Sequence, residues 1–405
     1  MKNIFGRNFD WHLFSIWIIL AVFGIIAITT ASAAKIGDEI HLKNYYWKQI
    51  IWLMISIIAF IIVLKIPLPI LDMLIYPLYL ATIILLIIVL FMPPVNNSRS
   101  WLFLGGVRFQ PSELAKMMMI LLVSKLIAKD YLNELKMLYK ALSVVIIPVF
   151  LILLEPDFGT TIIFWGSLAF MLIQAGFPAS YLVIIVSPLI GLIFSFNWIL
   201  FVIASLILIY YYYRESLSWV LIAFSTVFNT FIFILTPVFW NTLKAYQQNR
   251  IITFFNPMHD PLGAGYQVIQ AKIAIGSGQV FGKGFLQGSQ KNMNFLPEHH
   301  TDFIFSVIGE EFGFIGTFFL IVVFFVFFNR IIYLIKVVSK KEYKIAISGI
   351  FAYLLLQTFI NIGMNLGVLP TTGVPLPFIS YGGSNLLINS FAVAIILKYS
   401  EYRDI

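Results

Sequence analysis

Two charged residues lie close together at the start of a largely apolar stretch of the chain, residues 111–128. Glu113 and Lys116 are three positions apart, so on a helix they would share one face. An ion pair between them would offset the cost of placing charge within a bilayer. Pro111 and Ser112 also form an ordinary helix start, which explains part of the pattern without any function. Because ionisable groups at membrane depth mark functional sites by default, we interpret Glu113 and Lys116 as candidate functional residues.

A third charged candidate, Asp260, lies in the one long polar stretch of the chain, about residues 240–302. Asp-Pro followed by Gly is ordinary turn chemistry, so Asp260 could simply shape a turn. Its setting also fits a general base, because cations that could hold a phosphate lie in the same stretch. These cations are Arg250, Lys272 and Lys283.

Glu155 and Asp157 join two apolar segments. We interpret them as a solvated loop in which Asp157 lies at a helix start.

A second connecting segment, residues 370–385, is rich in proline and glycine. Irregular backbone at membrane depth is tolerated where it is buried in protein or lines a wet cavity, so this segment predicts a cavity. A kinked helix start would explain its prolines, but it explains Ser380, Ser384 and Asn385 less well.

The polar stretch ends in a cluster of histidines and carboxylates around His299 and His300. A metal site is disfavoured there, because adjacent histidines lack the helical spacing of a ligand pair. Thr301 and Asp302 could instead cap the helix that follows.

The composition defines the environment of all these residues. Of 405 residues, 60% are apolar and 11% charged, so most of the exterior must face hydrocarbon. The apolar runs of about 17–25 residues suit membrane helices and exclude both a soluble enzyme and a membrane β-barrel. The absence of cysteine excludes disulfides and thiolate metal sites. The net charge of +8 suits an anionic membrane surface or a phosphate-bearing substrate, and nothing indicates nucleic acid.

The sequence predicts an all-α polytopic membrane protein, with residues 1–405 forming a single membrane domain of about twelve helices. The predicted spans are Trp11–Ala34, Tyr46–Leu64, Ile70–Met92, Pro111–Ala128, Ala141–Leu154, Thr160–Ala175, Tyr181–Phe196, Ile199–Tyr212, Trp219–Phe239, Phe303–Ile335, Ile345–Leu366 and Pro377–Leu397. The short spans Tyr181–Phe196 and Ile199–Tyr212 could instead be one bent helix or a re-entrant pair. Most lysines and arginines of the short loops fall on the side of the N-terminus, which predicts cytoplasmic termini and places the polar stretch 240–302 outside.

In this order, these motifs resemble the SEDS family of peptidoglycan polymerases, and more closely its RodA type, which acts in elongation, than its FtsW type, which acts in division. The resemblance runs from the first span to the C-terminus. Its specific motifs are FQPSELAK at 109–116, EPDFGT at 155–160, DPLGAGY at 260–266, HTDFIF at 300–305 and GVPLPFISYGGS at 373–384, with a RodA-type continuation at 282–290. The chain departs from the family within residues 177–239, where an inserted helix pair would raise ten family helices to twelve.

The resemblance implies a glycosyltransferase of the bacterial cytoplasmic membrane that polymerises lipid II, with its active site outside. It implies that Asp260 is the essential loop aspartate and that Glu113 and Lys116 form an ion pair in a central cavity. Asp260 would take the proton from the acceptor's 4-hydroxyl as that oxygen attacks C1 of the donor. Candidate substrate-binding residues, several of them for the departing diphosphate, are Arg108, Arg250, Lys272, Lys283, Ser384, Ser380, Thr301 and Asp302.

The family also implies a class B penicillin-binding protein, a single-span transpeptidase, as partner. No cofactor is certain, although a divalent cation, Mg²⁺ or Mn²⁺, could share the diphosphate; no dedicated metal cage is visible in the sequence. A flippase for the same lipid is the alternative, since broken helices and intramembrane charges also occur in transporters. A scaffold that only anchors the transpeptidase would leave the three charged candidates unexplained.

Overall fold

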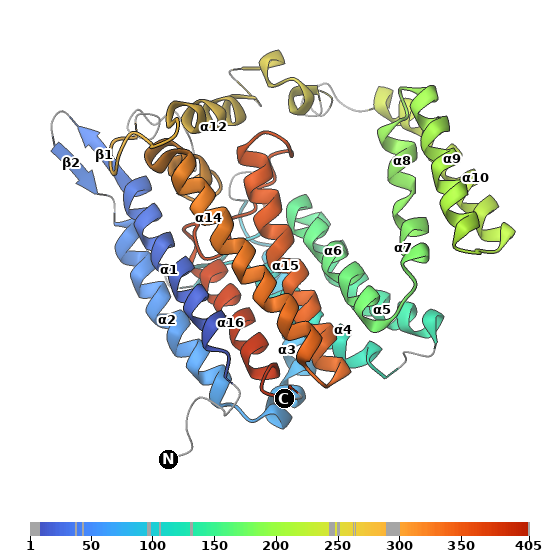
Figure 1. The fold of residues 1–405 in the computed structure, drawn as a ribbon, viewed down its shortest axis with the longest axis horizontal. Coiled ribbons are helices and arrows are strands. Elements are labelled where there is room, and N and C mark those ends of the chain that lie inside the picture. Colours follow the sequence, from blue (N-terminus) through green and yellow to red (C-terminus); the bar gives the residue numbers. More distant parts are fainter. Residues whose placement is uncertain are drawn as a thin grey trace. The chain divides into compact units, whose positions relative to one another are not determined.

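The computed structural model describes residues 9–36, 39–42, 44–94, 99–104, 107–129, 133–242, 248, 252–261, 263, 265–288 and 300–403 (Figure 1). The chain forms two compact units. The main unit comprises Met1–Ala175 and Tyr266–Ile405, and the second unit comprises Gly176–Gly265. The region 177–239, in which the sequence predicts an insertion, lies within the second unit.

The main unit is built from helices. They are α1 (Trp11–Ser32), α2 (Tyr45–Lys65), α3 (Leu68–Val89), α4 (Pro111–Ile127), α5 (Glu134–Leu154), α6 (Phe158–Ala175), α12 (Tyr266–Ser277), α14 (Ile304–Val337), α15 (Lys341–Asn365) and α16 (Gly383–Tyr399). Helix α14 packs beside α1 and α15, α16 packs against α2, and α15 also packs against α6 and α4 (Figure 1). As a result α15, with 78% of its most apolar window buried, forms the centre of the unit.

Two short antiparallel hairpins connect helices of the main unit. Strands β1 (Ala33–Ile36) and β2 (Glu39–Leu42) follow α1. Strands β3 (Leu102–Leu104) and β4 (Val107–Phe109) precede α4, with Leu102 opposite Phe109. The second hairpin places Arg108 directly before the helix that carries Glu113 and Lys116.

The second unit consists of apolar helices joined through a buried polar cluster. Its elements are α7 (Ala179–Val186), α8 (Pro188–Ile193), α9 (Trp198–Arg214), α10 (Trp219–Thr242) and the short 3₁₀ helix η1 (Pro257–His259). The Ser187 hydroxyl lies 3.1 Å from that of Ser225 and accepts a hydrogen bond of 3.1 Å from the Asn229 amide. These bonds join the break between α7 and α8 to α10, as polar side chains join helices within membranes.

Eight described helices are long and apolar enough to cross a membrane, and Ala179–Ile193, Trp198–Arg214 and Gly383–Tyr399 are shorter apolar helical segments. Each predicted span corresponds to described helix, which confirms the polytopic all-α fold. The predicted span Tyr181–Phe196 is a bent segment that breaks between α7 and α8 before Pro188, because proline cannot continue the backbone ladder. The last helix begins at Gly383 rather than at Pro377, since residues 377–382 are irregular.

Helix α14 departs from one continuous span at Gly313, whose φ of 64° and ψ of −160° are not helical. The segment after α12 supplies hydrogen bonds that the broken helix lacks. The Phe314 amide donates to the Gln279 carbonyl at 2.9 Å, and the Ile315 amide donates to the Val280 carbonyl at 3.1 Å. The backbone amides that follow the break therefore find hydrogen-bond acceptors within the protein.

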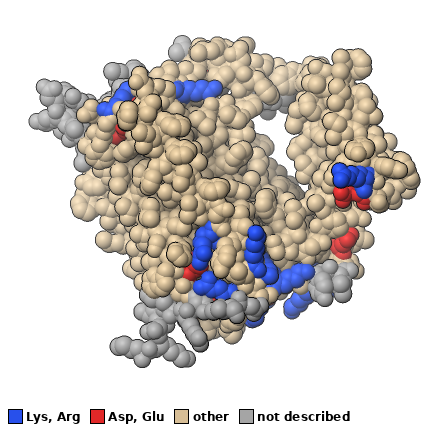
Figure 2. All heavy atoms as spheres, in the orientation of Figure 1, with Lys and Arg blue, Asp and Glu red and all other residues tan. Residues whose placement is uncertain are grey.

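Charged side chains are sparse on the face shown in Figure 2. One buried ionic contact joins distant parts of the main unit: the Asp10 carboxylate accepts from the Arg330 guanidinium at 2.6 Å and from that of Arg403 at 3.3 Å. Asp10 also caps α1, since it accepts from the Leu13 amide at 2.9 Å. This contact ties the start of α1 to α14 and to the C-terminal segment.

Candidate active site

The predicted charged pair exists and is buried. Helix α4 begins at Pro111, and Glu113 lies in its first turn. The Lys116 ammonium lies 2.9 Å from a Glu113 carboxylate oxygen, and each residue is at most 2% exposed. The spacing of three positions therefore places both side chains on one face, as predicted.

Polar groups from two other helices surround this pair. The Asn385 amide of α16 donates to the second Glu113 carboxylate oxygen at 3.4 Å. The Lys116 ammonium lies 4.9 Å from the centre of the Tyr353 ring on α15, within the range of a cation–π contact. Helices α4, α15 and α16 thus build one buried polar site in the main unit.

Asp157 caps α6 next to this site, which confirms its predicted place at a helix start. Its carboxylate accepts from the Thr160 amide at 2.9 Å and from the Thr160 hydroxyl at 2.7 Å. It also accepts from the Gln110 amide, just before α4, at 3.3 Å. Burial raises the pKa of Asp157, while the hydrogen bonds from Thr160 and the charge of Lys116 oppose that shift. Asp157 is therefore tied electrostatically to the buried pair.

The interpretation of Glu155 as a solvated loop residue is wrong, because its side chain is 0% exposed. It follows the end of α5, where the chain turns sharply at Pro156 with a φ of 31°. Burial, together with the nearby Asp157 charge, raises the pKa of Glu155 to about 8, while a hydrogen bond from Ser100 opposes the shift.

Replacing Glu155 by Gln should flatten the pH dependence of stability. The native chain holds the Glu155 proton up to about pH 8, whereas the unfolded chain releases it near pH 4.5. The native state thus binds more protons in this window, and the free energy of unfolding falls as the pH rises, by at most about 1.4 kcal/mol per pH unit. Thermal unfolding of the purified chain across the window measures this slope. Glu134→Gln, at an exposed carboxylate in the first turn of α5, is the matched control and should retain the slope.

A row of amide side chains on α15 supports the irregular segments on either side of this helix. The Gln357 amide donates to the Pro375 carbonyl at 3.0 Å. The Asn361 amide donates to the Val374 carbonyl at 2.8 Å and to the Asp302 carbonyl at 2.9 Å, and Asn365 donates to the Asp302 carbonyl at 2.9 Å. Sequence reasoning missed this row, although polar residues at positions i, i+4 and i+8 of an apolar helix are a visible signal.

Three of the predicted substrate-binding residues lie in or against these irregular segments. The Ser380 hydroxyl donates to the Thr301 carbonyl at 2.6 Å and accepts from the Leu376 amide at 2.8 Å. The predicted capping of the next helix by Thr301 or Asp302 is wrong, because the N-cap of α14 is Phe303 and makes no side-chain capping bond. The main-chain carbonyls of Thr301 and Asp302 accept the bonds from Ser380, Asn361 and Asn365.

Close approach of α1 to the segment 373–380 depends on Gly24. A Cβ at Gly24 would overlap the carbonyl oxygen of Phe378, which itself has a φ of 65°. Ser384 lies buried in the first turn of α16, directly before Asn385. The irregular segment is thus held by α1 on one side and by α15 on the other.

The predicted cations differ in their surroundings. The Lys283 ammonium donates to the buried Glu310 carboxylate at 2.7 Å, so it already has an acidic partner. Lys272, on α12, is exposed and lies against Gly367 after the end of α15. Arg108 is exposed on β4, with its guanidinium 5.5 Å from the Phe103 ring centre. Arg250 lies outside the described residues.

Asp260 belongs to the second unit and forms the predicted turn after η1. Its carboxylate accepts from the Gly263 amide at 3.0 Å, and its carbonyl accepts from the Gly265 amide at 3.0 Å. The side chain is half-buried. A carboxylate has about four acceptor positions, so a turn role and a role as base are chemically compatible.

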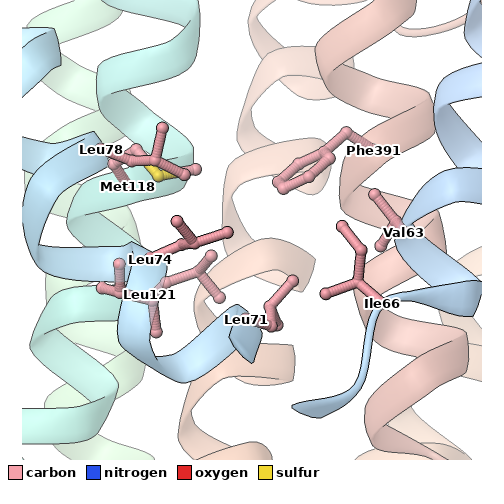
Figure 3. A pocket seen from close by; sticks show the side chains of 9 residues that line it. Val63, Ile66, Leu71, Leu74, Leu78, Met118, Leu121 and Phe391 are labelled. Atoms are coloured by element: carbon pink, nitrogen blue, oxygen red, sulfur yellow. The ribbon is translucent and has the colours of Figure 1, made fainter. Parts of the chain in front are cut away.

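An apolar cavity of about 80 Å³ lies between α2, α3, α4 and α16. In Figure 3, Leu74, Leu78, Met118 and Leu121 face Val63 and Phe391 across it. Every lining residue is apolar, so this cavity offers no site for a charged head group. Among the described residues, no group of three or more His, Cys, Asp or Glu side chains could hold a metal ion.

The chain is similar to known proteins over nearly its whole length. The family model for FtsW, RodA and SpoVE, described as cell cycle protein, matches residues 10–214 and 195–405. Peptidoglycan glycosyltransferase MrdB of Escherichia coli strain K12 is 32% identical, with 98% of this chain and 94% of that protein covered. Peptidoglycan glycosyltransferase RodA of Treponema pallidum is also 32% identical, with coverage of 96% and 97%.

Solved structures share the fold. A chain described under "Structural coordination of polymerization and crosslinking by a peptidoglycan synthase complex" is 26% identical and superposes with a TM-score of 0.70, covering 98% of this chain and 100% of that one. The rod shape determining protein RodA of Thermus thermophilus is 20% identical with a TM-score of 0.60, covering 98% of this chain and 99% of that one. The chain therefore belongs to the FtsW, RodA and SpoVE family, the SEDS family, and is a polytopic membrane peptidoglycan glycosyltransferase.

Proposed function

We propose that this enzyme polymerises lipid II into β-1,4-linked glycan strands during cell-wall elongation, on the outer face of the bacterial cytoplasmic membrane. The observation that carries the proposal is the buried Glu113–Lys116 ion pair in a chain similar to curated peptidoglycan glycosyltransferases. A fixed cation and carboxylate within a bilayer suit a substrate whose diphosphate lies at the membrane surface. The alternation of basic loops supports cytoplasmic termini and an outer position for residues 240–302.

In this proposal Asp260 is the general base. It takes the proton from the 4-hydroxyl of the acceptor's GlcNAc as that oxygen attacks C1 of the donor's MurNAc. The C1–O bond to the diphosphate breaks, and undecaprenyl diphosphate leaves with both bonding electrons. Because attack comes from the face opposite the leaving group, an α-linked donor gives a β-linked product.

The leaving diphosphate needs positive charge, and the chain offers several sources. Lys116 and the exposed Arg108 and Lys272 are the described candidates, with Arg250 as a further one. Lys283 is held by Glu310, so we propose that it fixes the segment after α12 as well as contributing positive charge. Ser380, Ser384, Thr301 and Asp302 would shape the wall of the substrate site rather than carry the reaction.

A divalent cation, Mg²⁺ or Mn²⁺, would neutralise diphosphate charge when bound. Such ions are commonly held by one or two carboxylates together with substrate phosphates, so a dedicated protein cage is not required. Asp157, which lies beside the buried pair in the main unit, and Asp260, which is half-buried in the second unit, are each a carboxylate that we propose for this role. Whether activity needs the cation is tested by chelation during the assay.

We further propose a class B penicillin-binding protein as partner in the bilayer. A solved neighbour is part of a peptidoglycan synthase complex for polymerisation and crosslinking, which supports a partner that crosslinks. The wide exposed apolar faces of the membrane helices would leave room for a single-span anchor beside the lipid.

Lipid transport is the alternative that the experiment must separate from polymerisation. The purified chain is reconstituted into vesicles with fluorescent lipid II, and both glycan formation and lipid translocation are followed in the same sample. We expect glycan in the presence of the partner and no translocation above that of empty vesicles. Translocation without glycan, from chain that is folded and partner-bound, would replace the polymerase proposal by a transporter.

A further inference from the structure

The buried ion pair belongs to a longer chain of hydrogen bonds that crosses three helices. Asn385 on α16 donates from its amide to Glu113 on α4 at 3.4 Å. Asn389, one turn further along α16, donates to the Asn385 amide oxygen at 3.0 Å. The Tyr353 hydroxyl of α15 donates in turn to the Asn389 amide oxygen. All of these residues are at most 4% exposed.

The donor and acceptor groups of Glu113 and Tyr353 determine the direction of the hydrogen bonds between them. An ionised Glu113 can only accept, so Asn385 must present its NH₂ group and keep its oxygen for Asn389. Asn389 must then present its own oxygen to the hydroxyl of Tyr353. Every hydrogen bond therefore points toward the Glu113 carboxylate, and the aligned dipoles stabilise its negative charge.

Lys116 contacts both ends of this series of hydrogen bonds, Glu113 and Tyr353. Lys116 binds the first carboxylate oxygen of Glu113 at 2.9 Å, while its ammonium lies 4.9 Å from the centre of the same Tyr353 ring. One tyrosine thus supports the carboxylate through its hydroxyl and the ammonium through its ring face. This arrangement holds both charges in place without bulk water.

We propose that Asn385, Asn389 and Tyr353 are positioning residues for the reaction, acting through Glu113 and Lys116 by fixing the orientation of both side chains. The inference rests on the proposed polymerase function for its effect on rate, but its effect on the ion pair does not depend on activity. A role in packing alone makes a different prediction, because it depends on side-chain volume and not on the direction of hydrogen bonds.

Replacing Asn385 by Asp changes the direction of its hydrogen bond to Glu113 while the side-chain volume stays almost constant. The change removes the donor and places a second carboxyl against Glu113. With the partner and lipid II present, we expect kcat to fall by about 10- to 100-fold, as for other small misplacements of reacting groups, with little change in KM. Ser390→Ala removes a buried hydroxyl of the same helix, whose described hydrogen bond runs to the Leu386 carbonyl of α16, and should leave the rate unchanged. Wild-type kcat in Asn385→Asp would overturn the proposal.

Two substitutions of Tyr353 distinguish the contribution of its hydroxyl from that of its ring. Tyr353→Phe loses the hydroxyl that donates to Asn389 and that also interacts with Glu113, but it keeps the ring under Lys116, so kcat should fall. Tyr353→Leu loses both contacts and should reduce kcat further. Equal rates in Phe, Leu and wild-type chains would contradict a positioning role.

A thermal double-mutant cycle tests the network in inactive protein as well. Asn385→Asp should lower Tm, and adding Glu113→Gln should restore much of it, because Gln can donate the hydrogen bond that Asp now accepts. The double variant should still form no glycan. If wild type makes no glycan but the cycle shows this recovery, the polymerase proposal fails and the network stands. If the two Tm losses simply add, the network fails whatever the activity is.

Discussion

Replacing Asp260 by Asn is expected to lower the rate of glycan polymerisation by about 10²–10⁴-fold, the range that general bases contribute. Asn cannot take the acceptor proton, but its amide oxygen can still accept from the Gly263 amide, so the turn after η1 is preserved. The measurement is the initial rate of glycan formation from purified lipid II with a class B partner present.

His259 provides the matched control for Asp260, because it is exposed in the same turn. His259→Gln should polymerise at close to the wild-type rate, and both variants should bind the partner as wild type does. A wild-type rate in Asp260→Asn together with a loss in Asp260→Ala would show that the residue shapes the loop and is not the base.

Replacing Lys116 by Met is expected to cost about 3–5 kcal/mol of stability, because it leaves the Glu113 carboxylate buried without its cation. Adding Glu113→Gln should recover most of that stability, since the pair is then replaced by neutral groups of similar volume. Neither variant should polymerise lipid II. Unfolding of the purified chains in detergent, followed by circular dichroism, measures the stability differences.

Lys125 lies on the same helix as Lys116 and is its matched control. Its ammonium donates to the Asp72 carbonyl at 2.7 Å rather than to a carboxylate, and it is half-buried. Lys125→Met should therefore leave the stability nearly unchanged. Equal losses from the two lysine variants would indicate that the buried pair has no special stabilising role.

The positions of most membrane helices could be predicted from the sequence, because runs of apolar residues of bilayer length report directly on burial in hydrocarbon. Departures occur where backbone geometry interrupts such a run. Hydropathy did not reveal the break of α14 at Gly313, because the flanking residues remain apolar. The hydrogen bonds that Phe314 and Ile315 make instead go to Gln279 and Val280, each 35 positions earlier in the sequence.

The candidate site was predictable where its residues are close in sequence. Glu113 and Lys116 follow from helical spacing alone, and Asp157 follows from its place before α6. The partners that complete the site are remote: Asn385 lies 272 positions from Glu113, and Glu310 lies 27 positions from Lys283. Such contacts depend on how helices pack, and no local pattern encodes them.

Burial of Glu155 illustrates the same limit for charge. A carboxylate in a loop between two membrane spans can be exposed to solvent or buried against neighbouring helices. The local sequence pattern is the same in both cases. In the structure Glu155 follows the end of α5 and is 0% exposed, so it is buried. The roles of Asp260 and the candidate cations stay predictions that only activity measurements can test.

The most direct measurement is glycosidic bond formation by the purified chain with a class B partner whose transpeptidase site is blocked by a β-lactam. We predict glycan that muramidase cleaves, with one undecaprenyl diphosphate released for each disaccharide added. Unchanged lipid II in the presence of a folded, partner-bound wild-type chain would contradict polymerisation by this chain.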